Sequence, residues 1–273
     1  MITLHHVERG QGPVLLLVHG WSQSTRCFEK QLADLSDRYR VVAVDLRGHG
    51  ESPKPTHGYR VARLAADLHE FVLEHDLHEV ALAGHSMGAS VIWSYLEQFG
   101  AARLAKLIFI DQAPLVTNGM GLTGAALVAA GCAFTPTSLY EIAHGIATDR
   151  AASLKGLRAA FFSAAVSEED FEQAVSESLK VPAACAARLL VDHASQDWRD
   201  VISEVIPTLG LPTLVFGGDL ATIFPPESAA WIAAQIPGAR LSVFGREEGG
   251  SHFMFWENPA KFNAVMREFL AGG

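Results

Sequence analysis

Six short apolar runs recur along the chain, and segments of helical periodicity separate most of them. The runs are PVLLLVHG, YRVVAVDL, HEVALAGHS, AKLIFIDQ, PTLVFGG and ARLSVFG. Most are rich in Leu or β-branched residues and lack clean alternation, as strands buried on both faces do. Segments such as VARLAADLHEFVLEHDL and MGASVIWSYLEQFG repeat apolar residues at helical spacing. The pattern predicts an α/β fold with a mostly parallel central sheet and helices on both faces.

This alternation stops between the fourth and the fifth run. Residues 113–211 contain helical patterns but no convincing strand. We therefore predict a helical cap at 113–205, inserted into a core formed by residues 1–112 and 206–273. The first part, from Gln112 to Tyr140, carries no charged residue. It is expected either to pack as core or to line an apolar pocket.

The amino-acid composition and the net charge limit the kinds of molecule that the protein is expected to bind. The chain has 273 residues, of which 49% are hydrophobic, and a formal net charge of -9. This balance argues against a nucleic-acid or anionic-membrane partner, because both require a basic face. Three widely spaced cysteines without a CxxC motif fit reduced thiols in packing roles, and the N-terminus has no basic stretch followed by an apolar run. We expect a cytoplasmic protein that binds a small molecule.

The third run ends in Gly84-His85-Ser86-Met87-Gly88 and leads into a helical segment. A GxSxG motif between strand and helix is typical of a tight turn that lifts a serine above the sheet edge. Ser86 is therefore the candidate nucleophile. A plain glycine-rich turn is the alternative.

A serine nucleophile needs a base, and His252 is the best-placed histidine. It lies in GGSHFMFWENP, between the last strand run and the last helical segment, at the same sheet edge as Ser86. His85 is expected either to contact substrate or to pack. His75 and His78 are interpreted as a solvated helix face, since no further metal-ligand motif accompanies them.

The first strong run ends in His19-Gly20-Trp21-Ser22. A loop at this place can direct a backbone N–H at a developing oxyanion, and a helix start supplies a second donor. The predicted donors are the amides of Trp21 and Met87. An ordinary turn is again the alternative.

The motifs HGWSQST, DLRGHGES, GHSMG, PTLVFGG and GGSHFMFWENP, in this order, resemble the α/β-hydrolase family with its cap domain. The resemblance covers nearly the whole chain and is weakest in the cap. It implies a Ser–His–acid site without a metal or an organic cofactor. The segment from Asp45 to Ser52 matches a motif that is chiefly structural in this family.

The family's usual acid is absent from the expected position. When Gly218 and Pro225 are aligned with the pattern G-x-x-D-x-x-x-P, Ala221 stands where the aspartate belongs. Asp111, at the end of AKLIFIDQ, is the predicted replacement, since some branches of the family take the acid from that strand. Asp219 is the remaining candidate, and each aspartate could instead be a turn residue.

The leading hypothesis is a serine hydrolase that cleaves a carboxylic ester or lactone of a hydrophobic or aromatic molecule. Phe134, Phe161 and Phe162 are expected to be cap core or pocket wall. The alternative is a cofactor-independent dioxygenase acting on a hydroxyquinolone-like substrate with His252 and Asp111 as its base dyad. A non-enzymatic ligand receptor is the third hypothesis. An aspartate nucleophile, as in haloalkane dehalogenases and epoxide hydrolases, is disfavoured by the serine at position 86.

Overall fold

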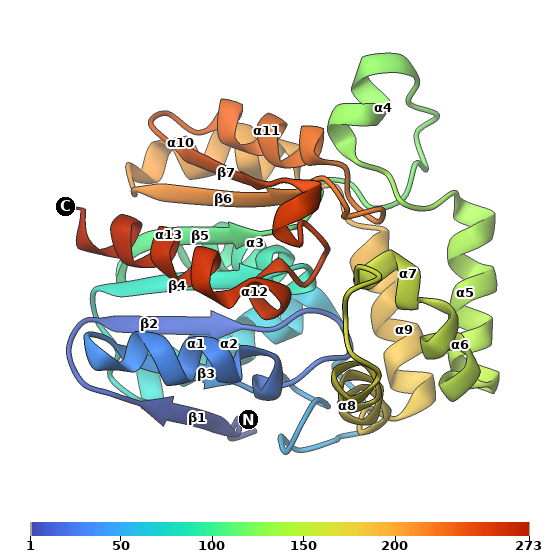
Figure 1. Cartoon of the computed structure of the whole chain (residues 1–273), viewed down its shortest axis with the longest axis horizontal. Coiled ribbons are helices and arrows are strands. Elements are labelled where there is room, and N and C mark those ends of the chain that lie inside the picture. Colours follow the sequence, from blue (N-terminus) through green and yellow to red (C-terminus); the bar gives the residue numbers. More distant parts are fainter. Residues whose placement is uncertain (1, 273) are drawn as a thin grey trace.

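The computed structural model describes residues 2–272, and its core is one sheet of seven strands (Figure 1). The strand order is β1-β3-β2-β4-β5-β6-β7; β1 is antiparallel to β3, and the other neighbours are parallel. The strands are β1 (His6–Arg9), β2 (Val14–Val18), β3 (Arg40–Val44), β4 (Val80–His85), β5 (Leu104–Ile110), β6 (Thr213–Gly218) and β7 (Arg240–Phe244). The predicted fold class is confirmed.

All six apolar runs form strands, but two features of the sheet edges differ from the prediction. The additional strand β1 was missed because HVER is short, polar and half exposed. At the opposite edge, β7 is not buried on both faces, since Leu241 and Val243 are exposed. Edge strands have one neighbour and less cover, so their sequence pattern is weaker than that of the central strands.

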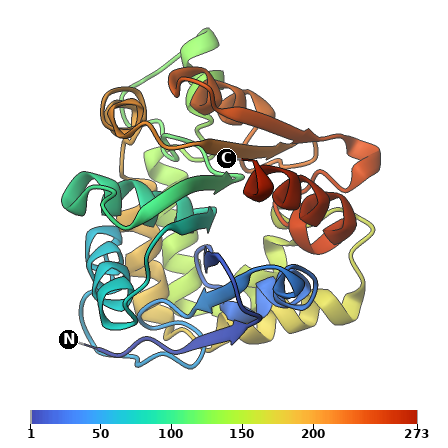
Figure 2. The same cartoon turned by 90° about the vertical axis from the view of Figure 1, so that its left-hand side faces the viewer.

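Helices cover both faces of the sheet (Figure 2). On one face lie α1 (Glu29–Asp34), α12 (Met254–Glu257) and α13 (Pro259–Ala271), with α1 and α12 each in contact with α13. The other face carries α2 (Val61–Glu74), α3 (Met87–Phe99), the short π-helical segment Val201–Val205, α10 (Ile206–Leu209) and α11 (Pro226–Gln235). Short 3-10 turns lie at Thr25–Phe28, Leu35–Asp37 and Arg246–Glu248.

Between β5 and β6 the chain is helical apart from two isolated β-bridges. Besides the Val201–Val205 segment and α10, its helices are α4 (Gly124–Ala130), α5 (Pro136–Thr148), α6 (Arg150–Gly156), α7 (Arg158–Phe161), α8 (Glu168–Leu179) and α9 (Ala183–Ala194). Helices α5 to α9 stand beyond the carboxyl ends of the parallel strands (Figure 1). We call this group the cap helices. Ligands of open α/β sheets bind at this edge.

Part of the uncharged segment from Gln112 to Tyr140 neither packs as core nor lines a pocket. Residues 111–117 are buried, and Val116, Ala133 and Phe134 line a cavity, as predicted. Helix α4, however, is largely exposed and packs against α11 rather than with the cap helices. Met120, with 70% of its surface exposed, shows that lack of charge did not mean burial here.

Within residues 2–272, no helix combines the length and the apolar character that crossing a membrane requires.

Candidate active site

Ser86 occupies the sharp turn between β4 and α3. Its φ of 54° and ψ of -127° are strained for a residue with a side chain, and its amide donates a 2.8 Å hydrogen bond to the carbonyl of Ile110 in β5. The neighbouring strand therefore holds the turn. This conformation places the hydroxyl at the sheet edge, as the GxSxG motif predicts.

The two glycines of the motif are required by close backbone approach. A Cβ atom on Gly84 would lie 2.5 Å from the backbone of Gly88, and one on Gly88 would lie 2.3 Å from the carbonyl oxygen of Val18. Any side chain at either position would force β2, β4 and α3 apart. The motif is therefore a packing requirement of the turn.

His252 meets Asp111 in a buried contact. The two side chains are 2% exposed, and His252 Nδ1 lies 2.5 Å from Asp111 Oδ2. Because the carboxylate accepts, Nδ1 carries the proton and Nε2 is left as the basic nitrogen. Asp111 has a φ of 46°, and its amide donates to the carbonyl of Phe216 in β6. Two neighbouring strands thus position the carboxylate.

Asp219 does not share this arrangement. Its side chain is exposed, and its amide donates to the carbonyl of Phe244 across the turn. Ala221, which replaces the family's usual acid, is buried with 4% of its surface exposed. The structure therefore brings Asp111, and not Asp219, to His252.

Burial is the main influence on the pKa values of His252 and Asp111. Removal from water lowers the pKa of His252 to about 3, so the imidazole is neutral in ordinary buffers. Burial raises the pKa of Asp111 well above its usual range, and a hydrogen bond from the Gly218 backbone opposes that rise. A neutral imidazole is the state that accepts a proton from a serine hydroxyl.

The backbone after β2, where the sequence predicts an oxyanion donor, lies close to Ser86. A Cβ on Gly20 would lie 3.0 Å from Ser86 Cβ, so the HGWS loop passes directly beside Ser86. His19 fixes this loop: its Nε2 accepts from the Leu46 amide at 3.0 Å, which leaves Nδ1–H to donate to the Gly20 carbonyl at 2.8 Å. Met87, the first residue of α3, has an amide without an intrahelical acceptor.

His85 packs between the Ser86 turn and the His252 loop. Its Nε2 lies 2.9 Å from the carbonyl oxygen of His252 and donates to it, and its ring centre is 4.5 Å from that of His252. The interaction links the serine turn to the histidine loop. His85 also lines the cavity described below, so it both packs and faces the ligand space.

The loop of residues 21–24 is attached to the cap at four consecutive positions. Trp21 Nε1 donates to the Ala186 carbonyl at 2.9 Å, and Ser22 Oγ accepts from Arg150. The remaining two contacts are Gln23 Nε2 to Ser178 Oγ at 3.1 Å and Ser24 Oγ to Glu177 Oε2 at 2.8 Å. The position of the Trp21 amide, one of the two predicted oxyanion donors, therefore depends on the cap.

Arg150 was not identified from the sequence. It is 7% exposed and makes no ion pair within residues 2–272; it also donates to the Ser178 carbonyl at 2.6 Å. Its guanidinium lies 5.7 Å from the centre of the Trp21 ring. Burial lowers the pKa of Arg150 to about 10, so the group stays charged in ordinary buffers. A buried charge without a counter-ion is costly and needs a local reason.

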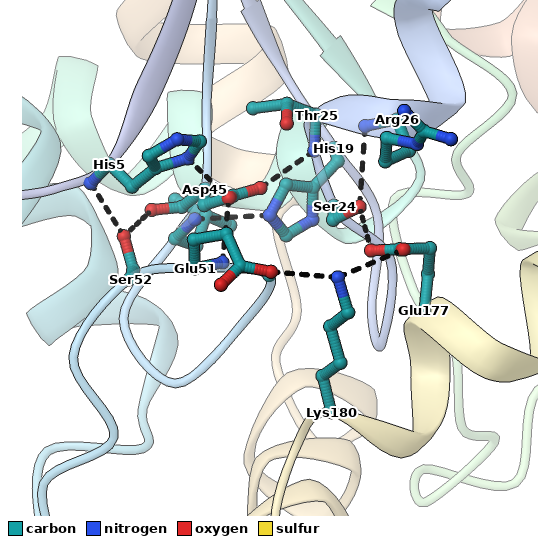
Figure 3. Close-up of polar contacts among 12 residues, drawn as sticks. His5, His19, Ser24, Thr25, Arg26, Asp45, Glu51, Ser52, Glu177 and Lys180 are labelled. Carbon is teal, nitrogen blue, oxygen red and sulfur yellow. Dashed lines mark hydrogen bonds and ion pairs between the residues drawn. The ribbon is translucent and has the colours of Figure 1, made fainter.

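The segment from Asp45 to Ser52 holds Thr25, the residue that follows this loop (Figure 3). Asp45 accepts hydrogen bonds from the amides of Thr25 at 2.7 Å and Glu51 at 2.9 Å. Lys180, in the cap, bridges Glu51 and Glu177 at 2.8 and 3.0 Å. The interactions are structural, in line with the role that the family resemblance implies.

A cavity of about 170 Å³ lies between the sheet edge and the cap helices. Ser86, His252, Gly20 and Trp21 line its floor, and within residues 2–272 no Asp, Glu, Lys or Arg side chain lines it. The cap contributes Val116, Ala133, Phe134, Ile142, Leu157, Ala160, Phe161, Leu190 and His193. This composition suits a hydrophobic ligand.

Two of the three predicted wall phenylalanines line the cavity. Phe134 and Phe161 do so, and the Phe161 ring is stacked 5.4 Å from the His252 ring. Phe162 instead stacks on Phe253 at 4.5 Å and is 8% exposed, outside the cavity lining. Phe162 is therefore a packing residue, because consecutive residues at the end of α7 point in different directions.

No cluster of three or more His, Cys, Asp or Glu side chains suited to a metal ion occurs in residues 2–272. His75 packs edge-on to His6, whereas His78 is exposed and pairs with Asp76. Helix α2 ends at Glu74 and His75 is only partly exposed, so the two histidines do not form the solvated helix face that the sequence predicted. Cys27, Cys132 and Cys185 are free thiols.

Several buried histidines make stability depend on pH. The pKa is lowered to about 3 in His193 and His252, and well below its usual value in His49 and His85, in each case chiefly by burial. Below pH 6.5 the unfolded chain binds these protons and the folded chain does not. Stability is therefore expected to be complete above pH 6.5 and to fall as the pH drops below it, with His193 and His252 each contributing about 1 kcal/mol per pH unit of that fall. The raised pKa of Asp111 offsets part of this loss.

Urea unfolding at pH 7.5, 6.0 and 5.0 measures this dependence. The midpoint is expected to fall at each step. Equal midpoints at pH 7.5 and 5.0 would show that the histidines are not buried and neutral.

Comparison with known proteins gives one family. A family model described as "alpha/beta hydrolase fold" matches residues 13–259. A Synechocystis sp. protein named "Putative non-heme chloroperoxidase" is 30% identical over 98% of this chain and 95% of its own length. Two solved structures are a bromoperoxidase from Bacillus anthracis (TM-score 0.89, 25% identity, 99% and 96% of the two chains) and an esterase from Exiguobacterium antarcticum (TM-score 0.87, 26% identity, 99% and 96%).

Proposed function

Because the chain belongs to the α/β-hydrolase fold family, we propose that it is a serine hydrolase cleaving a carboxylic ester or lactone of a hydrophobic small molecule. One observation carries the proposal. The strained Ser86 turn and the Asp111-bound His252 line the same apolar cavity. The esterase from Exiguobacterium antarcticum supports the reaction class.

The reaction begins with proton transfer from Ser86 Oγ to His252 Nε2. As the proton leaves, Oγ bonds to the carbonyl carbon and the carbonyl oxygen becomes an oxyanion. The amides of Trp21 and Met87 donate to this oxyanion. His252 then returns the proton to the leaving alkoxide, which releases the alcohol and forms the acyl-enzyme. Water, deprotonated by His252, repeats the sequence and releases the acid.

Asp111 keeps His252 in the productive tautomer. The carboxylate accepts from Nδ1–H and stabilises the imidazolium that forms during each proton transfer. Its burial at 2% exposure excludes competing water. We propose that Asp111 acts by positioning His252 and does not contact the substrate.

The proposal is tested by covalent labelling with a fluorophosphonate, followed by intact mass, and by hydrolysis of p-nitrophenyl butanoate and a δ-lactone. We expect one adduct per chain and measurable turnover of at least one of the two compounds. A protein that neither labels nor hydrolyses them would contradict the serine-hydrolase function.

A cofactor-independent dioxygenase is the second candidate. The observation that favours it is the position of the acid: Asp111 follows β5 and contacts His252, and some branches of the family, ring-cleaving dioxygenases among them, take the acid from this strand. There His252 and Asp111 would deprotonate a hydroxyquinolone, which then reacts with O₂. Oxygen uptake with a 3-hydroxyquinolone and no fluorophosphonate adduct would select this function.

Two of the relatives carry haloperoxidase names, which points to hydrogen peroxide as a second acceptor of the acyl group. An acyl-enzyme that water cleaves can also be cleaved by hydrogen peroxide, which yields a peracid. We therefore include peracid formation from an ester and hydrogen peroxide as a side activity of the Ser86 site. It requires no residue beyond those of the hydrolase.

Arg150 gives a prediction about the oxyanion donors. Its hydrogen bond to Ser22 and its charge beside the Trp21 ring favour negative charge near the Trp21 amide. Arg150→Met is expected to lower kcat about 10- to 100-fold with little change in KM, because the oxyanion forms only after binding. Ester kinetics of Arg150→Met, Arg150→Lys and the exposed control Arg188→Met provide the measurement. Partial rescue by Lys is expected, and a loss confined to KM would contradict this role.

A further inference from the structure

His193 is the one polar side chain that the cap contributes to the cavity lining within residues 2–272. It lies near the end of α9, whose earlier residue Ala186 is held by the Trp21 indole. The other cap residues at the cavity are aliphatic or phenylalanine. An apolar wall with one polar group is the usual composition of a specific small-molecule site.

Neither ring nitrogen of His193 has a hydrogen-bond partner within residues 2–272. The residue is 4% exposed, and its Nδ1 is buried and unpaired. Leaving a buried polar group unpaired costs about 1–3 kcal/mol, so buried polar groups are almost always paired. A ligand group in the cavity is a partner that the chain itself does not supply.

His252 does not supply the missing hydrogen-bond partner of His193. His252 Nδ1 is bound to Asp111, and no hydrogen bond joins the two imidazoles. Burial, with a smaller contribution from the neighbouring His252, lowers the pKa of His193 to about 3. His193 is therefore neutral, with one N–H donor and one nitrogen acceptor.

The charge of the lining defines the class of ligand. The cavity presents neutral His193 and, within residues 2–272, no lysine or arginine side chain, so it offers nothing to neutralise a carboxylate. A neutral hydroxyl, carbonyl or amide group matches a neutral imidazole without a cost in charge burial. Apart from Gln23, His85, Thr222 and the Ser86–His252 pair, the remaining lining is apolar, so the rest of the ligand is expected to be mainly apolar.

We propose that His193 is a specificity-determining residue, which binds a neutral hydrogen-bonding substituent on an otherwise hydrophobic substrate. This inference rests on the proposed function in that the substrate occupies the same cavity. The favoured substrates are esters or lactones that carry a hydroxyl, carbonyl or amide group away from the reacting carbonyl. Analogues without that group leave His193 unpaired and bind less well.

Equilibrium binding to Ser86→Ala tests the inference without requiring hydrolysis. The probes are ketones that imitate the ester shape: butyrophenone, its 3′- and 4′-hydroxy derivatives and its 4′-carboxylate. Isothermal calorimetry at pH 7.5 is expected to show at least one hydroxy ketone binding about 10-fold more tightly than butyrophenone. The carboxylate is expected to bind most weakly.

The double variant Ser86→Ala/His193→Leu should bind all three neutral ketones within about threefold of one another. His193→Gln keeps a donor and an acceptor and is expected to restore part of the preference. His144→Leu is the matched control, since His144 is exposed on α5, and it should leave the preference unchanged. Thermal unfolding of each variant verifies that it is folded.

A hydroxyl preference that survives His193→Leu overturns the inference. So does equal affinity for the three neutral ketones, tighter binding of the carboxylate, or no binding of any ketone. The outcome is separate from that of the proposed function. A His193-dependent hydroxyl preference in a protein that cleaves no ester would support the binding site and refute the hydrolase.

Discussion

Ser86→Ala is expected to abolish fluorophosphonate labelling and to lower kcat for ester hydrolysis by about 10⁶-fold. Removing the nucleophile of a serine hydrolase leaves only binding and oxyanion stabilisation, which retain a small residual rate. Because alanine removes a single oxygen atom from a buried turn, the fold and the ligand affinity should be preserved. The measurements are intact mass after labelling and the release of p-nitrophenol.

Ser176→Ala is the matched control, because Ser176 is exposed on α8. It should label and hydrolyse at the rate of the parent protein. Undiminished labelling of Ser86→Ala would place the nucleophile elsewhere and contradict the proposed mechanism. Undiminished hydrolysis without labelling would point to direct attack by water.

Asp111→Asn is expected to lower kcat by about 10⁴-fold with a small change in KM. An amide can direct its NH₂ at His252 Nδ1, which moves the ring proton to Nε2 and removes the base. Asp219→Asn changes an exposed side chain and should leave kcat within about twofold. Steady-state kinetics of the two variants, beside the labelling rate of each, compare the two aspartates directly.

The reverse result would assign the acid to Asp219 and would require its turn to rearrange in solution. Equal small effects of both substitutions would show that His252 works without an acid. Circular dichroism at pH 7.5 establishes that any loss in Asp111→Asn is not a loss of fold. Asp111→Glu serves as a further check, since a longer carboxylate displaces His252 and is expected to restore little activity.

Most of the fold could be predicted from the sequence, because central parallel strands and amphipathic helices leave strong periodic signals. The six apolar runs, and the turns around Ser86 and Gly20, are where the pattern placed them. Local signals failed at the sheet edges and in the cap. β1 is too short and polar for its pattern to show, and α4 is apolar yet exposed.

The residues of the site likewise fall into two groups, those that the sequence indicated and those that it did not. Ser86, His252 and the loop after β2 follow segments with clear strand and turn patterns, so the sequence placed them at one edge of the sheet. His193 and Arg150 carried no local signal, because both reach the site from the cap across more than 60 residues of sequence from Ser86. Their significance lies in burial and in missing partners, which a sequence does not record.

The sequence by itself determined the α/β fold and the candidate Ser86 and His252, because their signals are local. It placed two aspartates, Asp111 and Asp219, at strand ends and favoured Asp111 only through the family resemblance. The tertiary structure brought Asp111 to His252, since β5 lies between β4 and β6 and the 46° φ of Asp111 accompanies a buried carboxylate. The direction of a side chain at a turn depends on neighbouring strands and loops, and only the assembled sheet fixes it.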